Sequence, residues 1–122
     1  MSKSQNVEAI VIQWLNSNLG TGWTAYGDKP KTLPDRYVLV ARTAGGREAL
    51  VLDTAEIQIE VYSKVSRYDA STKADAIADE IYKLTEVHED ITRSKVNSVI
   101  QLDDTVTQTW RYQIYVDVYL RR

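Results

Sequence analysis

The sequence predicts an α+β fold: a mainly antiparallel mixed sheet of four to five strands, with two helices packed on one face. Three observations predict it. The segment from about residue 106 to 120 alternates apolar and polar residues, which is typical of a strand with one buried face. Residues 37–62 contain two further β-rich segments joined through a glycine pair. Two segments with apolar residues at helical spacing flank that pair.

The first helix is expected from about residue 6 to 18. Its apolar residues recur three and four positions apart, and Asn18 and Gly20 provide a stop signal. A Gly20–Gly22 turn and a short strand at 23–26 follow. Residues 27–34 contain two prolines, which disfavour both helix and strand, so we expect an irregular loop there.

A hairpin is expected next. Its first strand covers residues 37–43, Gly45-Gly46 forms the turn, and the return strand runs from about 50 to 62. In the return strand apolar and polar residues alternate cleanly, so one face is core and Glu56 and Glu60 lie on a solvated face. Asp53-Thr54 interrupts the alternation and predicts a bulge.

The second helix is expected from residue 69 to 84, capped by Asp69 or Ser71. Residues 86–93 are interpreted as a polar connection. A strand over 96–102 and the long last strand over about 106–120 complete the sheet.

The bulk properties limit the classes of function. A chain of 122 residues fits one domain, residues 1–122, and the absence of cysteine predicts no disulfide and no thiolate zinc site. A net charge of −2 argues against a non-specific nucleic-acid binder. We find no signal-peptide pattern and no apolar stretch near the ~20 residues that span a bilayer, and so expect a protein without membrane contact.

No catalytic, cofactor or metal site is predicted. His88 is the only histidine, and it lies in the polar connection expected at residues 86–93. No second metal ligand stands at the spacing that known metal-binding motifs require. The glycine pairs do not match phosphate-binding loops, and no nucleophile motif accompanies the histidine. We therefore expect no enzyme and no cofactor.

Two sequence segments resemble those of a known family: residues 36–47, RYVLVARTAGGR, and residues 51–62, VLDTAEIQIEVY. Together with the alanine-rich helix at 70–84 and the strand at 110–122, they resemble the tail terminator (tail completion) proteins of long-tailed bacteriophages, the lambda-type group. The resemblance implies a homo-oligomeric ring, typically a hexamer, on the end of the tail tube. Such a ring stops tube polymerisation and provides the surface for head joining.

The implied partners are the protein itself, the major tail tube protein and a head-completion or connector protein, with DNA in transit through the ring. The implied location is the tail or neck of the virion, and the host cytoplasm during assembly. A closed ring needs two complementary patches on each subunit. For these we select the predicted hairpin tip and the outer face and end of the last strand: Thr43, Ala44, Gly45, Gly46, Arg47, Glu48, Tyr115, Tyr119, Arg121 and Arg122. The proline loop is the expected tube or head contact, through Asp28, Lys29, Lys31 and Asp35.

Two alternatives remain open. One is a different neck, minor tail or head-completion adaptor protein of the same virion. The other is a small cellular RNA- or ligand-binding α+β domain, in which sheet aromatics would stack on bases.

Overall fold

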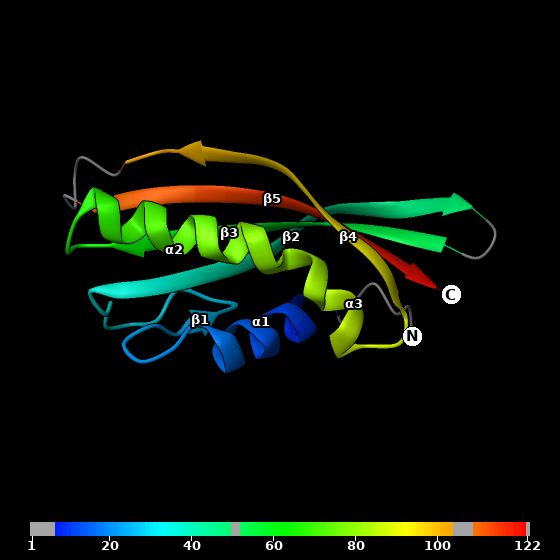
Figure 1. The fold of residues 1–122 in the computed structure, drawn as a ribbon, viewed down its shortest axis with the longest axis horizontal. Helices are drawn as coiled ribbons and strands as arrows, with labels where there is room; N and C mark the ends of the chain where they lie inside the picture. Colours follow the sequence, from blue (N-terminus) through cyan, green and yellow to red (C-terminus); the bar gives the residue numbers. More distant parts are fainter. Residues whose placement is uncertain (1–6, 50–51, 104–108, 122) are drawn as a thin grey trace.

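The computed structural model describes residues 7–49, 52–103 and 109–121, with the backbone alone for residues 44–49, 52 and 53. Five strands and two main helices confirm the predicted α+β class (Figure 1). In chain order the elements are α1 (Val7–Asn18), β1 (Ala25–Tyr26), β2 (Arg36–Ala49), β3 (Leu52–Ser63), α2 (Arg67–Glu80), the 3-10 turn η2 (Ile81–Lys83), α3 (Leu84–Val87), β4 (Ile91–Gln101) and β5 (Trp110–Arg121).

The strands form one sheet in the order β1-β2-β3-β5-β4. β1 pairs with β2 in parallel, over two residues, and every other pairing is antiparallel. The last strand, β5, is therefore an interior strand between β3 and β4. β4 is an edge strand, which pairs with β5 on one side.

The core lies between one face of the sheet and the helices. α1 contributes Val7, Val11 and Leu15, and α2 contributes Ala74 and Ile77. These side chains meet the alternating apolar residues of the long strands, each of which is fully buried: Val38, Val40, Ile57, Ile59, Val61, Ile114, Val116 and Val118. Burying one such side chain contributes about 1.5–3 kcal/mol, so this layer fixes which face of each strand points to the helices.

Two predicted helix boundaries, both of the second helical segment, are corrected by the structure. α2 begins earlier than expected because Ser66 is its N-cap: the Ser66 hydroxyl accepts a hydrogen bond of 3.0 Å from the N–H of Asp69. The Asp69 carboxylate instead accepts hydrogen bonds from the side chains of Arg36 and Ser63. The helical segment continues through η2 and α3 to Val87, so the polar connection shrinks to residues 88–90.

The predicted hairpin is present, but its predicted turn is wrong. Gly45 and Gly46 lie inside β2, opposite Ala55 and Thr54, and the chain reverses between Ala49 and Leu52. The predicted bulge at residues 53–54 is also wrong. β2 has 14 residues and β3 has 12, and two register shifts in β2 take up the difference, between Arg42 and Ala44 and between Arg47 and Ala49.

The remaining strands match their predictions in part. β1 is limited to two residues, and β4 begins five residues before its predicted start at residue 96. β5 follows the predicted alternation from Trp110 to Arg121, while residues 106–108 lie outside the described residues. The turn before β1 is confirmed by positive φ angles of 84° at Gly20 and 90° at Gly22.

Candidate assembly interface

The sheet face opposite the helices carries an aromatic stack. The rings of Tyr37 and Tyr62 are 4.6 Å apart and inclined by 6°, and the Arg111 guanidinium lies 5.8 Å from the Tyr62 ring. Stacking keeps both tyrosines buried, at 3% and 8% exposure, although no helix of the described chain covers this face. The aromatic surfaces are thus used within the subunit.

Glu60 is the centre of a polar network on the same face. Its carboxylate accepts hydrogen bonds from the Tyr62 hydroxyl (2.5 Å) and the Gln58 amide (3.0 Å), and it lies 3.6 Å from the Arg111 guanidinium. Burial, and next the hydrogen bond to Glu60, raise the pKa of Tyr62 to about 12. Glu60 lies on the outer face of β3, as predicted, but it is only partly exposed because its carboxylate cross-links β3 and β5.

Three of the predicted interface residues, Thr43, Tyr115 and Tyr119, have side chains that contact other residues of the subunit. The Thr43 hydroxyl donates to a carboxylate oxygen of Glu56 at 2.7 Å. The Tyr115 hydroxyl donates to the Gln113 amide oxygen at 2.9 Å, and Arg93 lies 5.8 Å from the Tyr119 ring. The structure describes only the backbone of the other hairpin residues: Ala44, Gly45, Gly46, Arg47 and Glu48. Arg121 is exposed, and Arg122 lies outside the described residues.

The two patches selected from the sequence adjoin each other. Tyr119 pairs with Thr54, and Arg121 pairs with Leu52, at the closed end of the β2–β3 hairpin. Most of both patches therefore lies at one end of one sheet, where β5 ends (Figure 1). Because β5 is flanked by strands on both sides, it cannot accept a neighbour's strand through its backbone.

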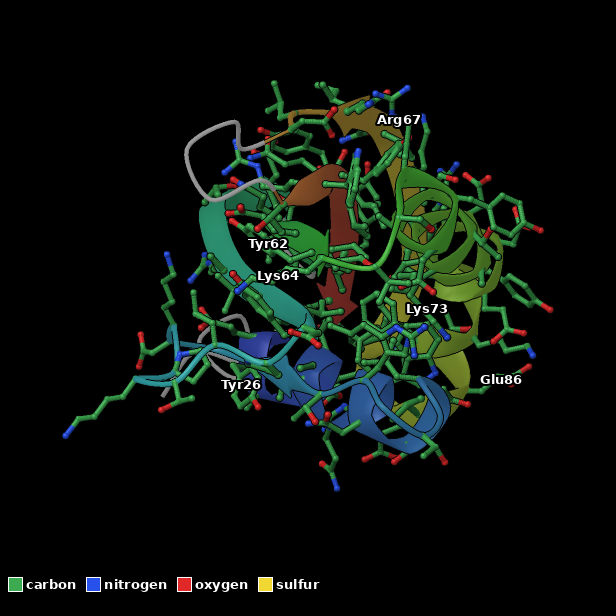
Figure 2. All side chains as sticks on the ribbon, turned by 90° about the vertical axis from the view of Figure 1, so that its left-hand side faces the viewer. Tyr26, Tyr62, Lys64, Arg67, Lys73 and Glu86 are labelled. Atoms are coloured by element: carbon green, nitrogen blue, oxygen red, sulfur yellow. The ribbon has the colours of Figure 1, made fainter. Side chains whose placement is uncertain are left out.

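The proline loop lies at the opposite end of the sheet from the hairpin tip (Figure 1). Its four selected residues, Asp28, Lys29, Lys31 and Asp35, are exposed. The loop is anchored at both ends. Before the loop, the Trp23 ring lies 6.0 Å from the Arg36 guanidinium and 5.5 Å from the Lys73 ammonium. After the loop, the Asp35 carbonyl accepts a hydrogen bond of 2.8 Å from the N–H of Lys64. Figure 2 looks onto this end and labels Lys64, which follows β3, and Arg67 and Lys73, which both lie on α2.

Sequence reasoning missed the β4 edge. Ile91 is buried, but most of the later side chains of β4 are exposed, including the apolar neighbours Val99 and Ile100. An available signal was the adjacent placement of Val99 and Ile100, because two consecutive apolar residues put one on each face of a strand. An edge strand with apolar side chains on both faces is a candidate for strand pairing.

The described residues hold little that resembles a reactive centre. The Nδ1 atom of His88 accepts a hydrogen bond of 3.2 Å from the N–H of Asp90, and this bond requires that Nδ1 carries no proton. The same Nδ1 atom lies 3.7 Å from the Asp90 carboxylate, and without a proton it does not form an ion pair with that carboxylate. Among residues 7–49, 52–103 and 109–121, no group of three His, Cys, Asp or Glu side chains is placed to hold a metal. Within the same ranges, no helix has the length and apolarity needed to cross a bilayer.

Comparison with known proteins gives a match in structure but none in sequence. No known protein family and no curated protein sequence matches this chain. Among solved structures, the chain is similar to one described as "Virion of native gene transfer agent (GTA) particle", with a TM-score of 0.64 and 10% sequence identity. The alignment covers 99% of this chain and 100% of that chain. At this identity the similarity establishes a shared fold, and function has to be argued separately.

Proposed function

We propose that this protein is a structural virion protein of the tail terminator type. It assembles as a ring, a hexamer, on the end of a phage-like tail tube, stops tube polymerisation and provides the head-joining surface. Its partners are copies of itself, the major tail tube protein and a head-completion or connector protein. It is located in the tail or neck of the virion, and in the host cytoplasm during assembly.

The observation that carries this proposal is the full-length fold similarity to a chain of a gene transfer agent virion. The two chains align from end to end, so the similarity extends beyond a common sheet motif. The resemblance of residues 36–47 and 51–62 to tail terminators is an independent line, because it rests on sequence phrases and not on coordinates.

The surfaces of the subunit suit an assembly role. The cavity between α1 and α2 has a volume of about 40 Å³, whereas small-molecule pockets commonly enclose ~300 Å³ or more. The charged proline loop and the hairpin end lie at opposite ends of the long sheet (Figure 1). A ring of such subunits would present two different rims, which suits a protein that joins a tube to a head.

The charge of the chain is compatible with DNA passing through the ring. Non-specific DNA binding depends on Lys and Arg neutralising phosphates, and a net charge of −2 offers no excess of either.

The RNA-binding alternative has less support. A base-stacking platform needs exposed aromatic rings, whereas Tyr37 and Tyr62 stack on each other and are almost fully buried. Tyr115 and Tyr119 remain half-buried on the same face, but each is already in contact with a polar neighbour.

A tube-growth assay tests the proposal. The tail tube protein encoded with this chain is polymerised with and without the purified protein, and tube lengths are measured by electron microscopy. We expect growth to stop when the protein is added, and added protein to be found at tube ends. If growth continues and the protein attaches only to heads, the terminator proposal fails and the head-completion adaptor replaces it. Salt-dependent RNA binding without tube binding would support the cellular alternative.

A further inference from the structure

The two edges of the sheet differ in how their backbones are protected. At the β1 edge, the Asn16 side chain makes two hydrogen bonds to Ala25, accepting from its N–H at 2.8 Å and donating to its carbonyl at 3.2 Å. Farther along, a carboxylate oxygen of Glu8 accepts from the N–H of Arg42 at 3.2 Å. Helix α1 thus supplies side-chain partners to this edge, up to residue 42 of β2.

The opposite edge, β4, has a protected half and an open half. Residues 91–97 contain two register shifts and the exposed cations Arg93 and Lys95, and both features discourage pairing with another strand. From Ser98 to Gln101 the strand has no register shift, and it contains no charged residue. No strand of the described chain pairs with its outer side.

Exposed apolar side chains gather beside this open half. The start of α2 lies next to the end of β4, where Arg67 and Asp103 approach to 3.7 Å. Five large apolar or aromatic side chains at this end of the molecule are 40–79% exposed: Val65, Tyr68, Val99, Ile100 and Leu102. Val99 and Ile100 lie on opposite faces of the strand, so exposed apolar side chains flank the unpaired edge on both faces, which is typical of an interaction site.

The backbone direction in the open half follows from one hydrogen bond. The N–H of Leu102 donates to the Arg111 carbonyl at 2.8 Å, so Leu102 points its backbone groups towards β5. In antiparallel pairing the inward and outward residues alternate. Val99 and Gln101 therefore direct their N–H and C=O groups away from the sheet, where another strand can bind them.

We propose that the open half of β4, residues 98–101, accepts the outer edge of β2 from a second copy of the chain, at residues 44–47, which lie in regular register between the two register shifts of β2. Both edges offer an extended backbone: beyond Leu39, no strand of the described chain pairs with the outer side of β2. The polarity also fits. β2 and β4 run in opposite directions at opposite edges of one sheet, so copies in the same orientation meet with antiparallel strands.

This contact is head-to-tail, which is the type that closes into a ring, so the inference rests on the proposed function and deepens it. The contact also requires a stagger. Within one subunit, residues 98–101 of β4 lie at the level of residues 38–41 of β2, so the neighbour must shift along the strand direction. A staggered pairing closes when the strands tilt relative to the ring axis, as in barrels. An unstaggered pairing would instead bring Arg42 of one copy near Lys95 of the next.

Cysteine cross-linking tests this contact directly, because the chain has no native cysteine. One copy carries Val99→Cys, and a second copy with a size tag carries cysteine at residue 44, 45, 46 or 47. Facing residues of antiparallel strands are close enough for a disulfide, so oxidation should give a mixed-size dimer from at least one pair. Asp75→Cys, on the exposed surface of α2, is the control and should give none.

The cross-linking is performed on concentrated protein and on protein bound to tail tubes. Dimers formed only between two Val99→Cys copies would mean that β4 pairs with β4, and would overturn the proposal. Cross-links to the tube or head protein in place of a second copy would overturn it as well. So would the absence of any β4–β2 cross-link on tube-bound protein.

A proline variant provides the second measurement. Gln101→Pro removes an N–H that points away from β5, and proline is tolerated at such edge positions. Gln101→Thr keeps the N–H and is the matched control. We expect Gln101→Pro to fold and melt like the control but to weaken self-association about tenfold or more. Equal self-association of the two variants would contradict the inference.

The two proposals fail in different ways. If Gln101→Pro self-associates normally while the wild-type protein still stops tube growth, this inference is wrong and the terminator function stands. If the wild-type protein does not stop tube growth but the β4–β2 cross-link forms, the terminator function is wrong and this contact stands.

Discussion

At the scale of single residues, the uncovered sheet face is organised by Glu60. A carboxylate in a half-buried position is stabilised when several donors surround it, and here Tyr62, Gln58 and Arg111 do so. The network joins β3 to β5 without a helix on that face. The face can therefore remain folded before any partner covers it.

The raised pKa of Tyr62 predicts a pH effect. The unfolded tyrosine ionises near pH 10, whereas the folded one retains its proton to about pH 12. Its stabilising contribution is thus complete below pH 10 and is lost as the pH rises towards 12. We expect Tyr62→Phe to lose this pH dependence, so that the difference in unfolding free energy between wild type and variant falls by up to about 2 kcal/mol over this interval.

Urea unfolding at several pH values between 9 and 12 measures this difference. Tyr82→Phe is the control, because Tyr82 is 57% exposed and lies on the helical segment. The control should parallel wild type at every pH. A Tyr62→Phe protein that loses stability in parallel with wild type would show that the network does not hold the Tyr62 proton.

At the scale of elements, the start of α2 depends on a cap, Ser66, that the sequence analysis did not select; it predicted Asp69 or Ser71. Ser66 caps the helix through Asp69, and Asp69 is free to bind Arg36 and Ser63 because it does not act as the cap itself. We expect Ser66→Ala to lower the unfolding free energy by about 1 kcal/mol. Ser71→Ala, which removes an exposed hydroxyl bonded to the Tyr68 carbonyl, should change it by less than about 0.5 kcal/mol.

Chemical denaturation of the two variants checks this prediction. Equal losses for Ser66→Ala and Ser71→Ala would contradict the assigned cap.

Sequence patterns predicted the elements better than their ends. The alternation of Ile57, Ile59 and Val61 determined the buried face of β3 correctly, because burial of one face is a strong constraint. The turn was misplaced because a glycine pair is a strong local turn signal, whereas here it lies in a strand between two register shifts. β4 was predicted too short because residues 91–95 are mostly polar and are held in the sheet by pairing with β5.

At the scale of the whole molecule, the predicted fold class is confirmed, whereas the selected interface residues remain predictions. A sequence indicates which residues alternate, but not the order of strands in the sheet. Without that order, the last strand was selected for the interface although it is an interior strand, and the β4 edge was overlooked. The selected residues at the hairpin tip and the proline loop remain predictions, and the structure places these two groups at opposite ends of the sheet (Figure 1).

The proline loop yields a prediction at this scale. A Lys29→Glu and Lys31→Glu double variant reverses two exposed charges at the rim. We expect unchanged melting and self-association, with weaker attachment to the tube or the head, because the change lies outside the core and the β4 edge. Co-sedimentation with tubes and with heads at low and moderate salt measures attachment. Glu86→Lys, an exposed charge reversal on α3, is the control and should attach normally.

The most direct test of the account is the number of copies bound per tail tube, counted with a fluorescent label on tubes of different lengths. A terminator ring predicts a constant number close to six at one end of each tube, independent of tube length. A number that grows in proportion to tube length, or tubes that carry no label, would contradict the account.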